Sequence, residues 1–227
     1  MDFDQYATTY ETEIERVAGV SVAGLAREKA RMALDIIALK TGAPGALRAL
    51  DFGCGIGLVD QHVEAHVAEL TGVDISARSL EVARRRAPKT HFAHFDGTKL
   101  AFADERFDAV FAIGVLLLVP IVSRGPLIAE MTRVLAPGGV MILMEHNPYN
   151  PATRWIVARC ALDADSNMLS RRESSALLRG AGLRDIGCRY YGFLPFRHKL
   201  VRRGERALSW LPIGAQYCVF GVKPGKS

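Results

Sequence analysis

Short apolar runs bounded by turn residues recur along the chain and alternate with segments whose apolar positions have helical spacing. The runs predict strands at residues 49–52, 70–75, 90–95, 107–113 and 140–145. Helices are predicted between them at residues 58–69, 76–87 and 126–135. Residues 109–113 and 140–144 are apolar without a break, which is typical of central parallel strands buried on both faces. The alternation therefore predicts a doubly wound α/β fold with a mostly parallel sheet and helices on both faces.

The segments on either side of this alternation have a different pattern. Helical spacing at residues 12–16 and 22–39 precedes the first strand, and we expect these helices to cover the ligand crevice. After residue 145, we expect two helices and then two strands, at residues 153–161, 172–179, 185–191 and 216–222.

A division into several domains is not expected. No linker rich in proline, glycine or serine interrupts the 227 residues. Within one domain we distinguish three parts: a helical lid and cap, a cofactor-binding core, and substrate-side helices with the last strands, at residues 1–47, 48–147 and 148–227.

Composition constrains where the protein works. Hydrophobic residues make up 49% and charged residues 23% of the chain, as in globular proteins. The longest apolar run, 109–122, is shorter than the roughly 20 residues that cross a bilayer, and the acidic residues 1–4 lack the pattern of a secretory signal. We therefore expect no export and no stable membrane insertion. The 4 cysteines form no C-x-x-C pair, so we expect no metal and a reducing, cytoplasmic setting.

The net charge of +5 raises the question of a nucleic-acid partner. The densest basic segment contains Arg197, His198, Lys199, Arg202, Arg203 and Arg206. Aromatic residues that could stack on bases are sparse there, so a solvated face is favoured over a phosphate-binding surface. We expect no nucleic acid as partner, and the sequence does not indicate an oligomeric state.

The strongest local motif, LDFGCGIG at residues 50–57, predicts a strand, a glycine-rich turn and a helix. Glycines permit positive φ and let a ligand approach the backbone. Leu58 stands where the dinucleotide fingerprint G-x-G-x-x-G has its third glycine, which weakens a pyrophosphate interpretation. Asp51, at the strand's end, suits a cationic ligand, although it could instead bond only its own loop.

Two further acidic residues follow the next two strands. Asp74 holds the position where a carboxylate accepts ribose hydroxyls, and Ser76 is a good cap for the helix that Asp74 would otherwise begin. Asp96 precedes Gly97, and the pair could bind the amine and a ring nitrogen of adenine. The alternative for Asp96 is that it caps a turn. The carboxyl ends of parallel strands meet in one crevice, so we expect the three acids there.

Together with FDAVF at 107–111 and LAPGG at 135–139, these motifs resemble those of class I, Rossmann-like S-adenosylmethionine-dependent methyltransferases. The resemblance covers about residues 1–147. It implies a seven-stranded sheet with one antiparallel edge strand, and S-adenosyl-L-methionine bound over the glycine loop. The implied cofactor-binding residues are Asp51, Gly53, Gly55, Asp74, Ile75, Asp96, Gly97 and Ile113.

Residues 3–10 resemble the lid of the family's small-molecule members, whose tyrosines close over cofactor or substrate. Tyr6 and Tyr10 are four residues apart and would share one face of a helix, so both can press on the crevice, and Tyr10 is also a candidate catalytic residue. His146 is the candidate base for a hydroxyl acceptor, because an imidazole titrates near neutral pH. It could instead be a loop histidine bonded to backbone. Tyr149 is expected to wall the acceptor pocket.

One departure from the family concerns the loop after the fourth strand, where many relatives carry histidines. This chain has GVLLLVP at residues 114–120, so we expect no polar catalytic group there. Methyl transfer mainly requires alignment and exclusion of water. We therefore expect methyl transfer from S-adenosylmethionine to an oxygen or nitrogen of a small molecule. The alternatives are an RNA or protein methyltransferase and a non-catalytic module that binds the cofactor.

Overall fold

The computed structural model describes residues 4, 7, 9–42, 44–161, 166–192 and 209–225. These residues build one seven-stranded sheet in the order β3-β2-β1-β4-β5-β7-β6. The strands are β1 (Arg48–Phe52), β2 (Glu69–Asp74), β3 (His91–His94), β4 (Phe107–Ile113), β5 (Leu135–His146), β6 (Arg184–Tyr191) and β7 (Gln216–Val222). The predicted α/β fold with a mostly parallel sheet is confirmed.

We had expected the antiparallel strand to lie at the edge of the sheet, but it lies one place inside the edge. β7 pairs antiparallel with both β5 and β6, so β6 is the edge strand. Five consecutive residues of β7 are buried, whereas β6 begins with two exposed residues, Arg184 and Asp185. An apolar strand gains more from a place between two neighbours, and a strand with charged residues tolerates an edge.

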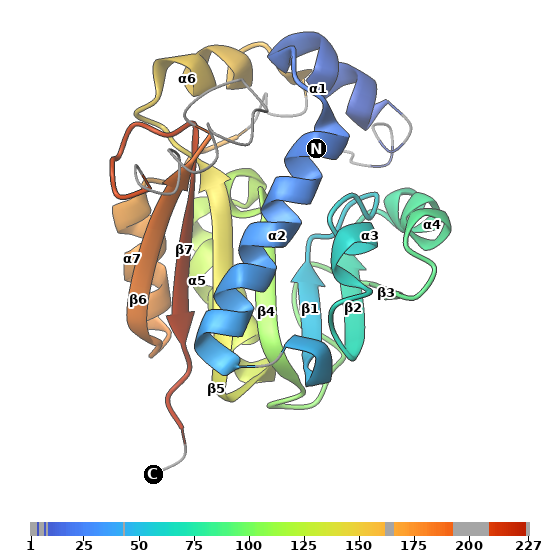
Figure 1. Ribbon diagram of the computed structural model, residues 1–227, viewed down its shortest axis with the longest axis vertical. Coiled ribbons are helices and arrows are strands. Elements are labelled where there is room, and N and C mark those ends of the chain that lie inside the picture. Colours follow the sequence, from blue (N-terminus) through green and yellow to red (C-terminus); the bar gives the residue numbers. More distant parts are fainter. Residues whose placement is uncertain are drawn as a thin grey trace.

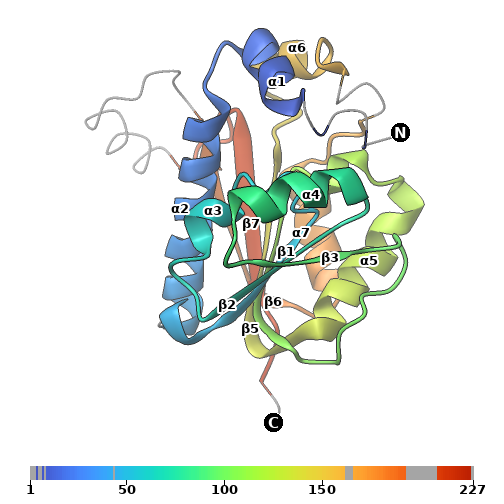
Figure 2. The ribbon, with the colours of Figure 1, turned by 90° about the vertical axis from the view of Figure 1, so that its right-hand side faces the viewer.

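Helices cover both faces of the sheet (Figures 1 and 2). One face carries α2 (Val22–Thr41), α3 (Asp60–Val63) and α4 (Ala77–Arg86), and the other carries α5 (Ile121–Val134) and α7 (Arg171–Gly180). Helices α1 (Tyr10–Ala18) and α6 (Pro151–Val157) lie beyond the carboxyl ends of the strands.

Helix α2 has a second role besides the expected one at the crevice, which parts of it line. This helix lies along the sheet and packs on β4 and β5. Its buried residues include Ala26, Ala30, Ala33 and Ile37, which are spaced three or four apart and form one apolar stripe. Because the stripe continues over most of the helix, α2 is also a layer of the core, and the lid role of α1 stays a prediction.

Helices α3 and α5 and strand β5 begin or end several residues away from their predicted bounds. The helix predicted at 58–69 is reduced to the four residues of α3, because the backbone N–H groups of Ala68 and Glu69 donate to the Leu47 carbonyl and draw the chain into β2. Helix α5 begins five residues before Pro126, which therefore lies inside the helix. β5 begins five residues early because Leu135 pairs with Phe107.

Two apolar layers fill the space between the sheet and its helices. Phe107, Met141 and Tyr217 are buried on the side of α5 and α7, while Ile36 and Phe111 are buried on the side of α2. The sheet is thus held from both faces, and the carboxyl ends of its parallel strands meet at one edge. No helix in the described ranges is long and apolar enough to cross a membrane.

Candidate active site

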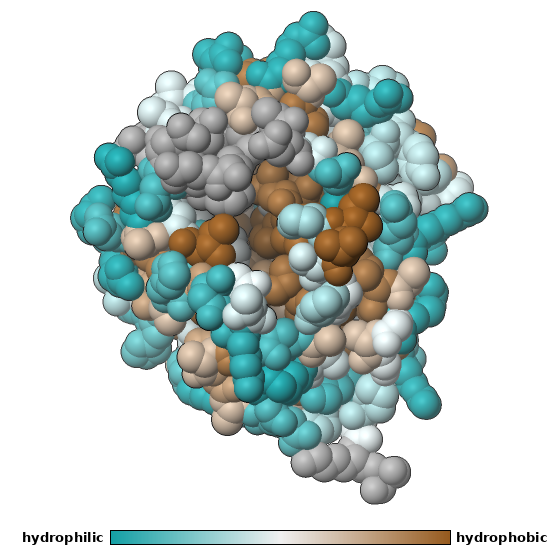
Figure 3. Space-filling model, turned by 180° about the vertical axis from the view of Figure 1, so that it is seen from behind, coloured by the Kyte–Doolittle hydropathy of each residue, from teal (hydrophilic) through white to brown (hydrophobic). Residues whose placement is uncertain are grey.

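A cavity of about 2310 Å³ lies at the carboxyl ends of the strands. Sites for drug-sized ligands typically measure about 300–1,000 Å³, so this cavity has room for two ligands at once. The glycine loop after β1 lines it, as do parts of α1, α2, α6 and the ends of β6 and β7. Seen from behind, the molecule is hollowed and the walls of the hollow are hydrophobic (Figure 3).

Seven of the eight residues expected to bind the cofactor line this cavity: Asp51, Gly53, Gly55, Asp74, Ile75, Gly97 and Ile113. They come from the ends of three strands and from the loops that follow β1, β2 and β3. Asp96 is the exception, because it is exposed and does not line the cavity.

The glycines of the loop have two different roles, because some allow close packing and one leaves space for a ligand. Gly53, Gly55 and Gly57 all have positive φ. A Cβ atom on Gly53 would lie 2.5 Å from Cγ2 of Val115, and one on Gly57 would lie 3.0 Å from Cα of Ala83 in α4. Nothing lies within 4 Å of a Cβ placed on Gly55. Gly53 and Gly57 are therefore required by close packing, while Gly55 leaves space on the cavity side.

Asp74 holds the glycine loop in place. Its Oδ2 accepts a hydrogen bond from the Gly55 N–H at 2.8 Å, and its Oδ1 accepts one from the Ser76 N–H at 2.9 Å. The Ser76 hydroxyl caps α4 by accepting from the Ser79 N–H at 3.0 Å. Asp74 is only partly exposed and stands on the cavity wall, so its expected contact with a ribose remains a prediction.

A pair of buried carboxyl groups lies beneath the loop. Asp51 and Asp60 are 2% and 0% exposed, and their side chains lie within hydrogen-bonding reach of each other. Burial raises the pKa of both carboxyls. Asp51 Oδ1 and both carboxylate oxygens of Asp60 are buried and have no hydrogen-bond partner among the described residues. Sequence reasoning missed Asp60, because a lone acid at a helix start is a common feature.

Asp96 caps a turn, which is the alternative that the sequence left open. Its Oδ1 accepts from the Thr98 N–H at 2.8 Å and from the Thr98 hydroxyl at 2.7 Å. These hydrogen bonds lower the pKa of the Asp96 carboxyl. The neighbouring Gly97 does line the cavity. A contact between Asp96 and adenine stays a prediction that would use the other carboxylate oxygen.

His146, Tyr191 and Gln216 form a polar group on the opposite side of the cavity, and we name them the acceptor cluster. Gln216 pairs with His146 across β5 and β7 and with Tyr191 across β6 and β7. The Gln216 amide nitrogen lies 3.2 Å from His146 Nδ1. Gln216 Oε1 and the Tyr191 hydroxyl are buried and have no hydrogen-bond partner in the part of the chain that the structure describes. Buried polar atoms of this kind normally meet a ligand or water.

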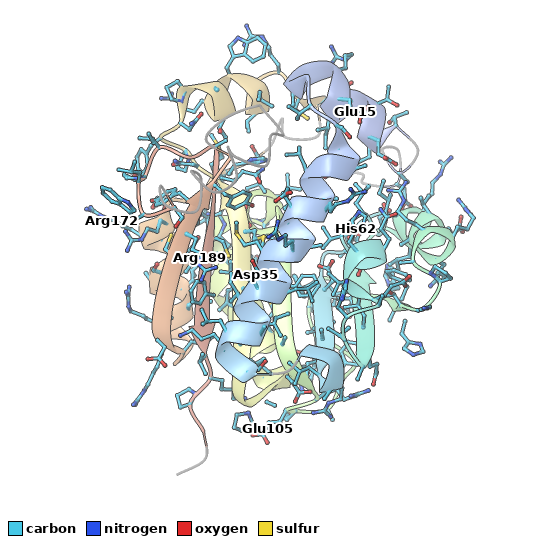
Figure 4. All side chains as sticks on the ribbon, in the orientation of Figure 1. Glu15, Asp35, His62, Glu105, Arg172 and Arg189 are labelled. Carbon is cyan, nitrogen blue, oxygen red and sulfur yellow. The ribbon has the colours of Figure 1, made fainter. Side chains whose placement is uncertain are left out.

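The pKa of His146 is lower than the near-neutral value that we had expected. Burial lowers its pKa to about 4, and the positive charge of Lys29 on α2 contributes in the same direction. The imidazole is therefore neutral at physiological pH. Figure 4 labels Asp35 on α2 and Arg189 on β6, which also line this part of the cavity.

The lid helix α1 is tied to its surroundings at both ends. Glu15 Oε1 accepts from the Val22 N–H at 3.1 Å, which links α1 to the start of α2 (Figure 4). Glu11 forms an ion pair with Arg86 of α4. Tyr10 lines the cavity, as the lid prediction requires, whereas Tyr6 lies outside the described residues. The role of Tyr10 in closure or catalysis remains a prediction.

Tyr149 does not wall the cavity, contrary to expectation. It is 72% exposed and contributes to a shallow groove on the outer side of α6. Its N–H donates to Asn147 Oδ1 at 3.1 Å, which places Tyr149 in an Asx turn between β5 and α6.

The apolar loop after β4 is held by Glu145, a residue without a stated role in the sequence reasoning. The Leu116 N–H donates to Glu145 Oε1 at 2.8 Å, and Oε2 is buried without a hydrogen-bond partner among the described residues. Burial raises the pKa of this carboxyl to about 7. The loop thus receives its polar anchor from the adjacent strand.

Comparison with known proteins agrees with this arrangement. Residues 50–143 match the family model described as a methyltransferase domain. A phthiotriol/phenolphthiotriol dimycocerosates methyltransferase of Mycobacterium ulcerans is 31% identical over 138 residues, or 59% of this chain and 49% of that protein. The O-methyltransferase cnsE of Penicillium expansum is 32% identical over 145 residues, or 60% and 52%. The chain spans about half the length of these curated relatives.

The fold has a counterpart among solved structures. The crystal structure of a SAM-dependent methyltransferase from Archaeoglobus fulgidus superposes with a TM-score of 0.71 at 15% identity, covering 89% of this chain and 95% of that one. Residues 50–143 therefore carry a methyltransferase domain, and the fold is shared with a solved SAM-dependent methyltransferase. The resemblance inferred from the sequence motifs is confirmed at this level.

Proposed function

We propose that the chain transfers a methyl group from S-adenosylmethionine to an oxygen or nitrogen of a small-molecule acceptor. The observation that carries this proposal is that one cavity contains both the glycine loop and the acceptor cluster. The cofactor supplies a methyl group activated by a positively charged sulfur. The protein's task is to align the acceptor and to keep water away.

The residues around the glycine loop suit the parts of this cofactor. The open side of Gly55 admits the methionine portion, and the Asp51 and Asp60 pair offers negative charge to its ammonium group. Asp74 stands where a ribose hydroxyl would meet it, and Gly97 lies on the adenine side. Ile75 and Ile113 contribute apolar flanks to the same site.

The acceptor cluster favours a molecule that bears oxygen. With Gln216 Nε2 donating to His146 Nδ1, the neutral imidazole carries its proton on Nε2 and can donate it toward the cavity. The Tyr191 hydroxyl can donate as well, and Gln216 Oε1 can only accept. Two donors and one acceptor suit a carbonyl or ether oxygen next to a hydroxyl. The printed name of the Penicillium relative, an O-methyltransferase, supports the same class.

The role of His146 follows from its low pKa. As a base it would be weak, so its main contribution is to orient the acceptor through hydrogen bonding. To receive the proton of a hydroxyl acceptor, the imidazole would need the other tautomer, in which Nδ1–H donates to the amide oxygen of Gln216 and Nε2 is free to accept. Tyr10 on the lid helix would close the cavity over the reacting atoms and exclude water.

Partners and setting belong to the same proposal. The large and mainly apolar hollow favours a small organic molecule over RNA or a protein, and the basic segment at 197–206 lies outside the described residues. We propose no nucleic-acid partner and no stable membrane insertion. All 4 cysteines are free, which is consistent with a reducing, cytoplasmic setting.

The first experiment measures cofactor binding by calorimetry. S-adenosylmethionine or its demethylated product should bind with micromolar affinity, about 8 kcal/mol, and NAD should not. Gly55→Val should abolish that binding because its side chain enters the cavity. Gly19→Val is the matched control, since Gly19 also has positive φ and open space around its Cβ position but does not line the cavity. Preferential binding of NAD would contradict the assignment.

The second experiment identifies the acceptor class. Cofactor labelled in its methyl group is incubated with extract fractions, and label is expected in a small, organic-soluble product. Incorporation into RNA that persists at high salt would favour the RNA alternative, because purely electrostatic binding is lost as salt rises. Cofactor binding without incorporation into any fraction would favour a non-catalytic module.

A further inference from the structure

Large apolar side chains are exposed at the end of the molecule where α6 lies. The exposed fractions are 72% for Tyr149, 53% for Trp155, 72% for Trp210 and 63% for Ile213. We name these four residues the aromatic face. Exposed tryptophans are unusual, because each buries a large apolar surface when it finds a partner. Single exposed apolar residues are common and need no explanation, but a group of four such residues does.

Hydrogen bonds hold the two segments that carry the aromatic face side by side. Asn150 Nδ2 donates to the Ile213 carbonyl at 2.8 Å. The buried Asn147 Nδ2 donates to the carbonyls of Pro212 at 3.1 Å and Gly214 at 2.8 Å. The start of α6 and the segment before β7 thus form one hydrogen-bonded unit, and these two segments carry all four residues of the aromatic face.

The charge of this unit is positive. Arg154 and Arg159 lie on or next to α6, and the described residues 147–161 and 209–216 contain no aspartate or glutamate. The Arg159 guanidinium carbon lies 4.3 Å from the centre of the Trp155 ring, so cation and ring are presented together. In the sequence, the basic stretch 197–206 precedes Trp210 by a few residues. The stretch itself forms no part of the aromatic face.

The aromatic face and the cavity share helix α6. Thr153, Ile156 and Val157 of this helix line the cavity. Trp155, between them in sequence, is more than half exposed and lines the shallow groove on the outer side. A partner bound to the aromatic face would therefore sit directly beside the roof of the active site.

We infer that the aromatic face docks on the surface of an anionic lipid bilayer and that the acceptor reaches the cavity from there. Tryptophan and tyrosine favour the boundary between headgroups and acyl chains, where one end of the ring system is wet and the other is apolar. Arginines beside them are attracted to anionic headgroups. Such docking leaves the chain on the surface of the bilayer and inserts no spanning segment. The inference concerns a surface outside the cofactor site, so it does not depend on which atom is methylated.

The chain contains 2 tryptophans, and both belong to the aromatic face, so intrinsic fluorescence reports directly on it. Purified full-length protein is mixed with vesicles of equimolar phosphatidylcholine and phosphatidylglycerol, and separately with pure phosphatidylcholine. We expect a blue shift with the anionic vesicles, quenching by brominated acyl chains, and co-sedimentation that weakens as salt rises. Equal binding to both vesicle types, or no fluorescence change with either, would overturn the inference.

Variants locate the contact. Trp155→Ala and Trp210→Ala should each weaken co-sedimentation about tenfold, and Arg159→Gln should weaken it less and only with anionic vesicles. Val122→Ala is the matched control, because Val122 is 86% exposed but lies on α5. All of these variants should bind S-adenosylmethionine as the unchanged protein does, which shows that they fold and separates this test from the proposed function. An equal loss in the control would contradict the inference.

A second copy of the chain is the main rival partner for the aromatic face. Sedimentation velocity without lipid distinguishes the two. A dimer that Trp210→Ala converts to a monomer would assign the face to self-association and overturn membrane docking. A monomer in both cases, together with vesicle binding, supports it.

Discussion

The cofactor half and the acceptor half of the cavity are assembled in different ways. The seven expected residues of the cofactor half that line the cavity lie between positions 51 and 113, each at or just after the end of a strand. The acceptor half joins Tyr10 with His146, Tyr191 and Gln216, which are spread over almost the whole chain. Local motifs can specify the first half because each motif includes its own strand end. The second half exists only after β6 and β7 have paired beside β5.

The two halves also differ in how they handle charge. The cofactor half buries two carboxyl groups beneath the glycine loop, and burial raises the pKa of both. The acceptor half buries neutral polar groups, and its histidine is kept uncharged by burial and by Lys29. A half that is negative suits a cationic cofactor, whereas a neutral half does not compete for it. Variants in the acceptor half should change turnover, and variants in the cofactor half should change cofactor affinity.

The largest expected effect is on turnover in the acceptor half. His146→Ala should lower kcat by about 10²–10⁴-fold for a hydroxyl acceptor and much less for a neutral amine. Cofactor affinity should be unchanged, because His146 lies opposite the glycine loop. With a pKa near 4, the imidazole is already neutral at higher pH, so kcat should not titrate with this group between about pH 6 and 9. A histidine-dependent rise of kcat around pH 6.5, the ordinary imidazole pKa, would contradict the neutral assignment.

A smaller effect is expected on cofactor affinity in the cofactor half. Asp74→Ala should weaken S-adenosylmethionine binding by about 1.5–3 kcal/mol, the scale of hydrogen bonds to a charged group. Part of this loss would come from the glycine loop, which Asp74 holds through Gly55. Calorimetry measures the change, and Asp96→Ala serves for comparison because its Oδ1 is occupied by a turn. An Asp96 variant that loses as much affinity as the Asp74 variant would show that the adenine contact dominates.

Stability should respond to Glu145, which anchors the loop between the two halves. The pKa of this carboxyl is about 7 in the folded protein and ordinarily 4.5, so the folded state keeps a proton that the unfolded chain releases. Its contribution to stability is fully present below the ordinary value and is lost as pH rises through about 7. Glu145→Gln should therefore raise the free energy of unfolding by about 1–3 kcal/mol near pH 8 and change it little near pH 4. Urea titrations at the two pH values measure this, and a variant that is equally stabilised at both would contradict it.

The smallest effect is a fraction of a proton released on cofactor binding. Burial raises the pKa of the Asp51 and Asp60 carboxyls, and a nearby ammonium group favours the charged carboxylates. Binding should therefore release protons, and affinity should rise with pH until the pair is ionised in the free protein. Calorimetry in buffers of different ionisation enthalpy detects the release, and Asp60→Asn should reduce it. Proton uptake on binding would contradict the raised pKa values of the pair.

Much of the fold was predictable because its signals are local. The apolar runs of the central strands and the helical spacing of α2 and α4 depend on neighbours within a few residues. The predictions were wrong where a distant contact decides the structure. The Leu47 carbonyl shortens α3, and Phe107 extends β5 by pairing with Leu135.

The place of the antiparallel strand was also a matter of distant contacts. Both β6 and β7 have strand-like sequences, and neither sequence states which neighbour the strand will take. The order follows from competition for burial, in which the apolar β7 gains more than β6 from a position beside β5.

The sequence by itself determined the class I methyltransferase domain, because a glycine loop and acids at strand ends lie within short segments that fold into the same shape wherever they occur. Only the tertiary structure decided the acceptor half. It brought Tyr191 and Gln216 to His146 by strand pairing, turned Tyr149 outward, and paired Asp60 with Asp51 under the loop. Hydrogen bonding and desolvation act through space, so they depend on neighbours that lie far away along the chain.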